Sequence, residues 1–342
     1  MPGPYNGIRT KKGGRITERT GILSLFGGLA LFLFGMDRMS EALQQAAGER
    51  LRRALAALTR TPLTGALAGM VVTAVMQSSS ATTVMVIGFV SAGLLELPQA
   101  VAVIFGANIG TTVTAQLLAF RVEEMLGLVL FGGFFLCAVA RTKRGRQMGT
   151  AVFSFGLLFA GMEQVQSVVE PLALRPEFEA WMAQVREKPL WGLLLGLGMT
   201  LVVQSSSATI GVLQGVARQA GPDGVHSLLG LAGAVPVLLG DNVGTTITAI
   251  LAAAGGTRDA KRAAAAHCCF NLSGSLVCLL ALPWFVRLVE LLPPEGEELE
   301  IIARQIANAH TLFNALCTLI WLPLTPLMVR LVTTLVPEKR TE

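Results

Sequence analysis

Residues 76–83 read Met-Gln-Ser-Ser-Ser-Ala-Thr-Thr, and residues 203–210 read Val-Gln-Ser-Ser-Ser-Ala-Thr-Ile. Each is a short polar segment inside a long apolar stretch, and the two copies are 127 positions apart. A second pair of blocks follows in the same order, Gly-Ala-Asn-Ile-Gly-Thr-Thr at 106–112 and Gly-Asp-Asn-Val-Gly-Thr-Thr at 240–246. Matched blocks in one order indicate an internal duplication that covers most of the chain.

The composition is that of a membrane protein. Of the 342 residues, 52% are hydrophobic and 14% are charged, whereas a soluble globular domain carries roughly 25% charged residues. The apolar stretches lie around residues 21–36, 62–95, 98–119, 125–140, 148–162, 190–217, 225–254, 262–289 and 306–337. Several reach the length of about 20 residues that a helix needs to cross a bilayer. Because they are continuously apolar rather than alternating, a β-barrel is disfavoured, and the sequence predicts an all-α polytopic membrane protein.

The duplication predicts four parts along the chain. They are a cytoplasmic N-terminal tail (1–20), a first repeat (21–147), a second repeat (148–289), and a last segment (290–342) with an acidic loop, a final transmembrane helix and a tail. The formal net charge is +5. Because the cations lie in loops and tails, where Lys and Arg act as topology signals, the charge does not indicate a nucleic-acid partner.

The matched connections after the first helix of each repeat differ in charge. Residues 37–61 carry five arginines against three acidic residues, whereas residues 163–188 carry five acidic residues against three basic ones. Two copies inserted with opposite orientation show this difference, so we predict inverted-topology repeats. A single span would put the basic tail and residues 37–61 on opposite faces of the membrane. The sequence leaves open whether the first apolar segment crosses fully.

The apolar stretches that carry the repeated blocks are expected to be broken or re-entrant helices. As one straight helix, residues 62–95 would be about 51 Å long, well above the hydrocarbon thickness of about 30 Å. The chain is therefore expected to turn at Gln-Ser-Ser-Ser, or to continue into a second helix. We expect a similar break with unwound backbone at the glycines of the second blocks, Gly106, Gly110, Gly240 and Gly244. Broken helices at membrane depth persist only where they line a cavity.

The Gln-Ser-Ser-Ser segments offer neutral groups that suit an anion. Hydroxyls and carboxamides both donate and accept hydrogen bonds, and the start of a half-helix adds free N–H groups and the positive end of the helix dipole. A single serine in a membrane helix most simply joins two packed helices, but two matched sets favour a shared site for a compact oxyanion such as phosphate. The predicted anion-binding residues are Gln77, Ser78, Ser79, Ser80, Thr82, Thr83, Gln204, Ser205, Ser206, Ser207 and Thr209.

The second blocks indicate a cation site, because neutral amide, hydroxyl and backbone oxygens are the ligands that broken transporter helices offer to Na⁺. Asp241 departs from its counterpart Ala107, and an acid in an apolar segment binds a cation or a proton by default. The alternative is that Asp241 caps a helix at the membrane surface. The predicted Na⁺ ligands are Gln77, Ser80, Asn108, Thr111, Thr112, Gln204, Ser207, Asp241, Asn242, Thr245 and Thr246.

A third repeated element reads Ala-His-Cys-Cys-Phe-Asn at 266–271 and Ala-His-Thr-Leu-Phe-Asn at 309–314. Its histidine and asparagine fall on one face of a helix, four residues apart. We expect these side chains to hydrogen-bond between helices and position the site rather than bind a metal or relay a proton. They are His267, Asn271, His310 and Asn314. The five cysteines show no metal spacing and are expected to be small buried hydrophobic residues.

In these three sets of motifs the chain resembles the type II sodium/phosphate cotransporter family in its short bacterial form. The resemblance covers roughly residues 21–335 and implies Na⁺-coupled uptake of inorganic phosphate by symport across the cell membrane, the inner membrane in bacteria. It places both Gln-Ser-Ser-Ser segments at the substrate and sodium sites. The animal members have a large disulfide-bearing loop between the repeats; here residues 141–147 are short and lack a cysteine pair. We also expect no soluble regulatory domain after the last helix.

Three alternatives remain at the sequence level. One is a Na⁺- or H⁺-coupled carrier of another oxyanion or a carboxylate, such as sulfate or citrate, and another is a membrane sensor that transports nothing. The third, an enzyme with a serine nucleophile, needs a base within reach, and no His, Asp or Lys adjoins either segment. No ATP-binding Gly-rich loop is present. We therefore predict a transporter without enzymatic activity or organic cofactor, and leave open whether it is a homodimer.

Overall fold

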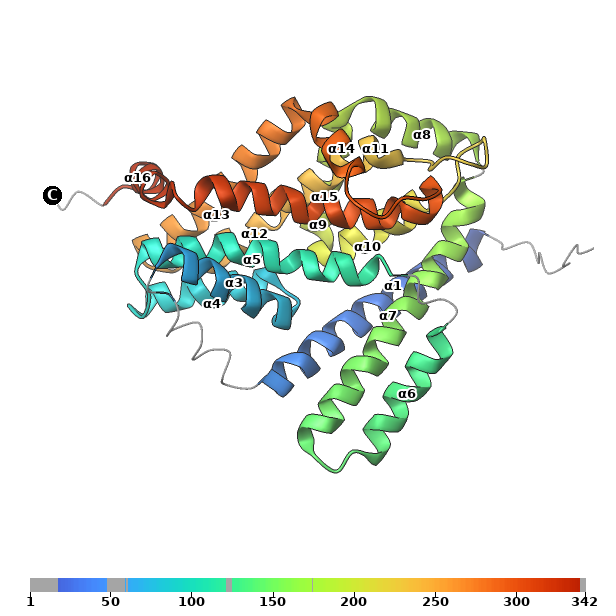
Figure 1. The fold of residues 1–342 in the computed structure, drawn as a ribbon, viewed down its shortest axis with the longest axis horizontal. Helices are drawn as coiled ribbons and strands as arrows, with labels where there is room; N and C mark the ends of the chain where they lie inside the picture. Colours follow the sequence, from blue (N-terminus) through green and yellow to red (C-terminus); the bar gives the residue numbers. More distant parts are fainter. Residues whose placement is uncertain (1–17, 48–58, 60, 121–124, 174, 339–342) are drawn as a thin grey trace, which may run out of the picture.

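The computed structural model describes residues 18–47, 59, 61–120, 125–173 and 175–338 (Figure 1). These residues are almost entirely helical and contain no strand beyond an isolated bridge between Ala220 and Ser227. The helices are α1 (Glu18–Ala47), α3 (Pro62–Met76), α4 (Ser79–Ser91), α5 (Leu97–Leu118), α6 (Leu126–Val139), α7 (Lys143–Ala173), α8 (Pro176–Glu187), α9 (Pro189–Val203), α10 (Ser206–Ala217), α11 (Gly230–Gly244), α12 (Thr246–Ala253), α13 (Arg258–Leu280), α14 (Leu282–Glu290), α15 (Glu298–Trp321) and α16 (Thr325–Leu335).

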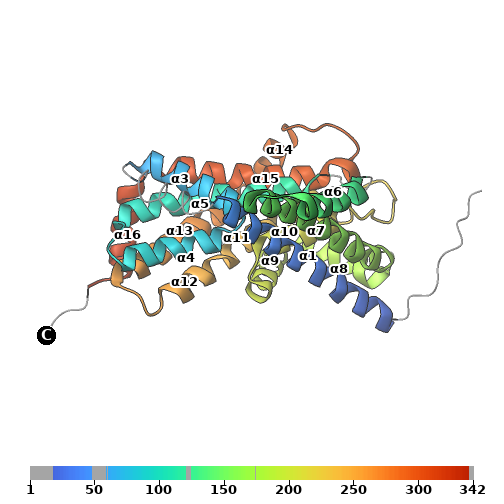
Figure 2. The same ribbon diagram turned by 90° about the horizontal axis from the view of Figure 1, so that it is seen from below.

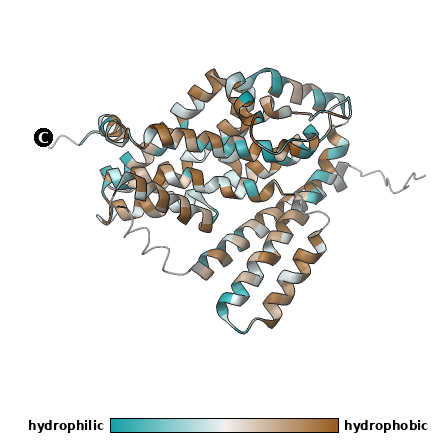
Figure 3. Ribbon diagram, in the orientation of Figure 1, coloured by the Kyte–Doolittle hydropathy of each residue, from teal (hydrophilic) through white to brown (hydrophobic). Residues whose placement is uncertain are grey.

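Several helices have the length and apolar composition of a membrane span, which confirms the predicted class. Five spans qualify among the described residues, and α15 with α16, bent by 87° (Figure 2), makes a sixth if the pair is counted as one. The five are Gly21–Ala46, Leu97–Leu118, Lys143–Ala173, Gly230–Ala253 and Arg258–Leu280. Hydrophobic residues also cover much of the outer surface, most clearly along α6, where Phe131 and Phe134 are exposed (Figure 3). Such a surface suits lipid rather than water.

The predicted turns at Gln-Ser-Ser-Ser are present in both repeats. Helix α3 has 15 residues, about 22 Å, and is too short to cross the hydrocarbon layer. Gln77 caps the C-terminal end of α3 and Gln204 caps that of α9, and both glutamines have a φ of 55°. Left-handed backbone is uncommon outside glycine. Its presence at both glutamines shows that the two repeats share one turn geometry. Helices α3 and α4 are joined by this turn and form a re-entrant hairpin (Figure 1).

The expected unwinding at the second pair of blocks is wrong for the first repeat. Helix α5 is continuous through Gly106 and Gly110. A Cβ at Gly106 would collide with the backbone of Ala66 on α3, and one at Gly240 with the backbone of Leu193 on α9. The glycines therefore serve close helix contact and not unwinding. In the second repeat the helix is interrupted only at Thr245, after Gly244 ends α11.

Within each repeat the re-entrant helix and the following long helix run in the same direction. The close contacts of α3 and α5 advance together, from Gly65 beside Ala102 to Gly110 beside Met70. Helices α9 and α11 repeat the arrangement, with contacts at Gly192 and Gly196 that advance along α11. The same packing is therefore built twice.

The two repeats run in opposite directions. Gln214 Nε2 donates to Ala115 O and Arg218 Nη2 donates to Ala119 O, so α10 runs parallel to α5. Because α10 reverses the direction of α9 at the Gln204 turn, and α11 follows α9, α5 and α11 point in opposite directions. This is the inverted topology that the sequence predicts.

Helices α1, α6 and α7 form a separate group at the side of the molecule (Figure 1). Gly28 and Gly35 of α1 lie against Gly161 and Leu158 of α7, so these two helices pack closely and antiparallel. The predicted first helix at 21–36 is too short, since α1 continues to Ala47. Residues 48–58 and 60 of the predicted polar connection lie outside the described residues, as do 1–17 and 339–342. The last three residues of the predicted N-terminal tail (1–20) belong to α1.

Candidate functional site

Each re-entrant hairpin begins its second helix with the same serine cap. Ser78 Oγ accepts a hydrogen bond from the N–H of Ala81 at 3.2 Å, and Ser205 Oγ accepts one from Ala208 at 3.3 Å. Side-chain caps of this kind are favoured at helix starts because the first N–H groups have no partner in the helix. The positive ends of α4 and α10 therefore lie at the two Gln-Ser-Ser-Ser segments, where they favour an anion.

A threonine pair joins the two helices of each hairpin. Thr73 Oγ1 donates to Thr82 Oγ1 at 2.8 Å, and Thr200 Oγ1 lies 3.1 Å from Thr209 Oγ1. All four side chains are buried. Thr73 and Thr200 were missed as candidates, although they are separated by the same 127 positions as the two copies of the motif. That shared spacing was the signal that could have found them.

The second repeat adds a carboxylate to this arrangement. Asp241 is fully buried, and its Oδ1 accepts a hydrogen bond from Thr200 Oγ1. Its Oδ2 has no partner among the described residues, and no described Lys or Arg forms an ion pair with it. An unpaired buried carboxylate is strongly unfavourable, so a cation or a proton must neutralise it. The alternative of a surface cap is wrong, because the side chain is buried within the helix bundle.

Contacts with α1 and between the repeats bring the two segments together. Ser40 Oγ donates to Met76 O beside Gln77, and one turn earlier on the same helix Met36 Sδ accepts from Ser205 Oγ at 4.0 Å. Thr248 Oγ1 donates to Ser80 Oγ at 3.2 Å, which joins the repeats directly. Both hairpin turns therefore flank one segment of α1. Neither α1 residue was predicted, because nothing in the repeated motifs points to them.

The two turns differ in how far they are covered. Gln77 is only 5% exposed; its Oε1 accepts from Thr114 Oγ1 at 2.8 Å, and its Nε2 donates to Ala74 O. Gln204, at the matched position, is exposed. Of the other predicted anion ligands, the buried ones are Ser79, Thr82, Thr83, Ser207 and Thr209, and the half-buried ones are Ser78, Ser80, Ser205 and Ser206. The Oγ1 of Thr83 has no partner among the described residues.

The asparagines of the second blocks are held by the third repeated element. Asn108 Oδ1 lies 3.3 Å from His267 Nε2 on α13, and Asn242 Oδ1 lies 3.4 Å from His310 Nε2 on α15. Asn314 Nδ2 also donates to Asn242 Oδ1, at 3.3 Å. All five side chains are buried. The element predicted to join helices therefore lies directly on the predicted cation ligands.

The threonines of these blocks bond to their own helices. Thr112 and Thr246 donate to the carbonyls of Ile109 and Val243, at 2.8 and 2.7 Å. Thr111 and Thr245 do the same with Ala107 and Asn242. Their oxygens keep lone pairs with which they could accept or coordinate. Among the described residues, no group of three or more His, Cys, Asp or Glu is placed to hold a metal ion, so a bound cation would depend on neutral oxygens and Asp241.

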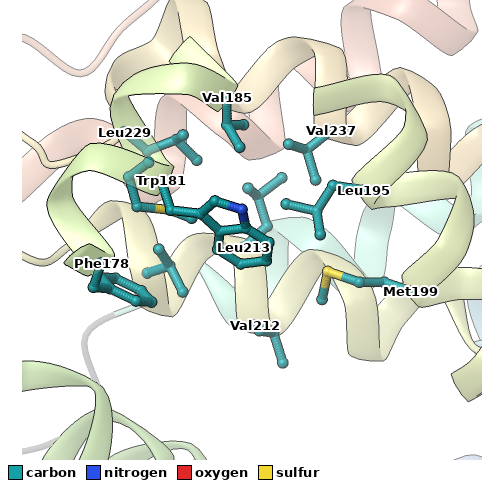
Figure 4. Close-up of a pocket in the computed structure, with 11 residues that line it drawn as sticks. Phe178, Trp181, Val185, Leu195, Met199, Val212, Leu213, Leu229 and Val237 are labelled. Atoms are coloured by element: carbon teal, nitrogen blue, oxygen red, sulfur yellow. The ribbon is translucent and has the colours of Figure 1, made fainter. Parts of the chain in front are cut away.

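A cavity elsewhere in the second repeat has a different chemistry. It has a volume of about 150 Å³ and lies between α8, α9, α10 and α11, with Trp181, Leu213 and Val237 in its wall (Figure 4). Its wall is apolar and contains none of the predicted site residues. The indole N–H of Trp181 is the one side-chain donor among its lining residues, too few for an oxyanion, so the two hairpin turns remain the candidate site.

Inverted repeats whose broken helices meet inside an all-α membrane protein define a multi-pass transporter. A family model described as Na⁺/Pi-cotransporter matches residues 31–167 and again residues 160–291. The chain belongs to the Na⁺/Pi-cotransporter family. The double match also agrees with the internal duplication.

Relatives differ in length and in what their names describe. YqeW of Bacillus subtilis (strain 168), named an uncharacterized protein, is 34% identical over 275 residues, which are 80% of this chain and 87% of YqeW. The "Putative inorganic phosphate export protein YjbB" of Escherichia coli (strain K12) is 27% identical over 258 residues, 75% of this chain and 46% of YjbB. Sodium-dependent phosphate transport protein 2A of Rattus norvegicus is 38% identical over 97 residues, 28% of this chain and 15% of that protein. No solved structure matches the chain.

Proposed function

We propose that this protein is a secondary active transporter that takes up inorganic phosphate together with Na⁺ across the cell membrane by alternating access. The observation that carries the proposal is the meeting of two capped half-helix starts, each with a Gln-Ser-Ser-Ser segment, beside one segment of α1. Family membership and the relatives named for phosphate transport support the substrate.

The anion is bound by neutral donors. The serine hydroxyls, the carboxamides of Gln77 and Gln204 and the free N–H groups of α4 and α10 replace the hydration of phosphate without a full positive charge. Charge-assisted bonds to Arg are about twice as strong as neutral ones and would slow release. A carrier must release its substrate in every cycle, so neutral recognition suits this task.

Na⁺ supplies the positive charge that the protein itself does not. Asp241 Oδ2, which has no partner among the described residues, is the strongest ligand of the proposed cation site, with Thr245, Asn242 and the Gln-Ser-Ser-Ser oxygens as neutral ligands. His267 and His310 act by positioning Asn108 and Asn242. Phosphate and Na⁺ then neutralise each other in the site, and neither binds well alone.

The direction of transport follows from coupling. An inward Na⁺ gradient drives uptake through a symporter, whereas a protein that exports phosphate needs another driving force. The relatives include one named for export and one named for sodium-dependent transport, so the proposal of uptake rests on the cation site and is tested by the gradient.

The test is ³²P-phosphate flux in proteoliposomes with the Na⁺ gradient and the membrane potential varied independently. We expect uptake that requires inward Na⁺ and is not competed by sulfate or citrate. Ser79→Ala and Ser206→Ala should each abolish it, while Ser167→Ala, which alters an exposed serine of α7, should not. Flux that is independent of Na⁺, competition by sulfate or citrate, or unchanged flux in both site variants would refute the proposal.

A further inference from the structure

Gln214 lies on the candidate site's side of α10 but was not predicted. It follows Ser207 by seven residues, about 10 Å along the same helix face. The side chain is 2% exposed, and its Nε2 donates both to Ala115 O on α5 and to Ala303 O on α15, at 3.1 and 3.0 Å. Its Oε1 has no partner among the described residues. One carboxamide therefore joins three helices, about 10 Å along α10 from the site.

A second polar contact closes the same end. Arg304 Nη1 donates to Gln116 Oε1 at 2.7 Å and to Gln116 O at 3.2 Å, and its guanidinium lies 4.4 Å from the centre of the Phe120 ring. Gln116 Nε2 in turn donates to Asn308 Oδ1 and Thr311 Oγ1. Cations favour the carbonyl end of a helix, which accounts for Arg304. It does not account for the two glutamines.

The internal symmetry provides a matched comparison, because the corresponding end of the other repeat has the same helices with different side chains. The spacing of 127 positions pairs α4 with α10, and the repeated blocks pair α5 with α11 and α12 together, and α13 with α15. The pairs are Gln214 with Ile87, Gln116 with Ile250, Asn308 with Ala265, Thr311 with Cys268, Arg218 with Ser91 and Arg304 with Lys261. In every pair but the last, a polar or charged residue at the Gln214 end corresponds to an apolar or smaller residue at the Ile87 end.

Because the repeats are inverted, these two ends face opposite sides of the membrane. Ile87 is buried in the same apolar cluster as Ala249, the counterpart of Ala115. Residues around Gln214, such as Ala115 and Ala303, belong to this cluster too, so the two ends differ in the hydrogen bonds of Gln214 and Gln116, which Ile87 and Ile250 cannot make.

We propose that Gln214, with the Gln116–Arg304 pair, forms a polar gate that phosphate itself helps to open, and that the Ile87 end is an apolar gate without this property. The proposal rests on the proposed function, since it names the route of the same oxyanion. A phosphate that leaves the Gln-Ser-Ser-Ser segments can accept the hydrogen bonds that Gln214 and Arg304 give to backbone carbonyls. The polar groups then exchange partners and are not left unpaired, which is the costly outcome. The apolar gate has Ile87 and Ile250 in place of the two glutamines, so it lacks their carboxamide donors.

The experiment measures the half-saturating phosphate concentration from each side of uniformly oriented proteoliposomes. Gln214→Ile gives the polar gate the residue of the apolar one, and Gln116→Leu removes the side-chain acceptor of Arg304 at a less buried position. We expect each to raise half-saturation at least about fivefold from one and the same side, equal to about 1 kcal/mol, and less than about twofold from the other. Half-saturating Na⁺ should stay unchanged.

Two matched variants complete the test. Gln219→Leu changes a residue just beyond α10 whose side chain donates to Gly215 O of that helix, and it should change nothing. Ile87→Gln should alter phosphate half-saturation from the opposite side. If the wild-type protein transports phosphate but the Gln214 and Gln116 variants show equal shifts from both sides, or no shift, the gate alone is overturned. A wild-type protein without phosphate flux would overturn the proposed function and the gate with it.

Discussion

The two Gln-Ser-Ser-Ser turns have one backbone and two environments. Both glutamines have a φ of 55°, and both following serines cap a helix in the same way. Yet Gln77 is buried under contacts from α1 and α5, whereas Gln204 is exposed. The first repeat has Ala107 where the second has the buried Asp241. Backbone geometry is thus shared, while access and charge differ between the repeats.

This difference teaches how a duplicated fold can move a substrate in one cycle. If both turns were equally covered, or equally open, the site would be reached from neither side or from both. One covered and one open turn is the state expected of inverted repeats that exchange roles during transport. The charge difference cannot exchange between the repeats, because it lies in the amino-acid sequence itself, with Ala107 in one repeat and Asp241 in the other. The proposed cation site should therefore be asymmetric in every state of the cycle.

The largest expected effect comes from removing that asymmetry. Asp241→Ala makes the second repeat like the first, and we expect Na⁺-dependent phosphate flux to fall roughly 100-fold, equal to about 3 kcal/mol, because the proposed cation site then loses the one carboxylate proposed for it. Removing a buried unpaired carboxylate should not lower stability, so the thermal transition serves as the control. Flux at the wild-type level would show that Asp241 is not part of the site.

The glycine contacts test whether the two repeats pack alike. Gly69→Ala and Gly196→Ala each place a Cβ against a backbone carbonyl, that of Val103 or Val237. We expect each to lower the free energy of unfolding by about 2 kcal/mol. Gly198→Ala meets nothing within 4 Å and should instead stabilise α9 by about 0.5–1 kcal/mol. Thermal unfolding in detergent ranks the three variants by stability. A Gly196→Ala variant as stable as the wild type would contradict the close packing of α9 on α11.

The histidines should differ in importance between the repeats. His267→Leu leaves Asn108 Oδ1 without the donor that the structure gives it, whereas after His310→Leu the Asn314 amide still donates to Asn242. An unpaired buried acceptor costs about 1–3 kcal/mol, so we expect roughly tenfold weaker Na⁺ activation for the first variant and a smaller loss for the second. His267→Gln keeps a donor and should restore most activity. Equal losses in all three variants would refute a positioning role.

The smallest effect is expected for the loop between α10 and α11, which contributes no residue to the candidate site. The backbone N–H of His226, with that of Val225 and the His226 ring, lowers the pKa of Asp223 to about 2, and Asp223 raises the pKa of His226. The histidine's contribution to stability is present below its ordinary pKa and lost as pH rises through the raised pKa. The aspartate's contribution is present above its ordinary pKa and lost as pH falls towards about 2.

Asp223→Asn should therefore lower the pKa of His226 towards its ordinary value while leaving phosphate flux unchanged. The chain has three histidines, and the other two are buried. The titrating signal in NMR of histidine-labelled protein should thus be that of His226. A change in flux larger than about twofold would connect this exposed loop with transport, against the weak effect expected of exposed charges.

Much of the site could be predicted from repetition. Two polar segments in apolar surroundings cannot persist by chance at one spacing, and a glutamine followed by serines both ends one helix and caps the next, so local chemistry alone sets the hairpin turn. The inverted orientation could be predicted from loop charges. The glycines were misread, because glycine permits both an unwound backbone and a close helix contact, and the neighbouring helix decides between them.

The sequence by itself determined the membrane class, the duplication, the re-entrant turns and the polar residues that meet there, because each follows from local composition and from matched spacing. Only the tertiary structure decided that α1 covers one turn more than the other, that His267 and His310 hold Asn108 and Asn242, and that Gln214 joins three helices. These contacts link residues far apart in the chain. Their existence depends on how the helices pack, which no local pattern specifies.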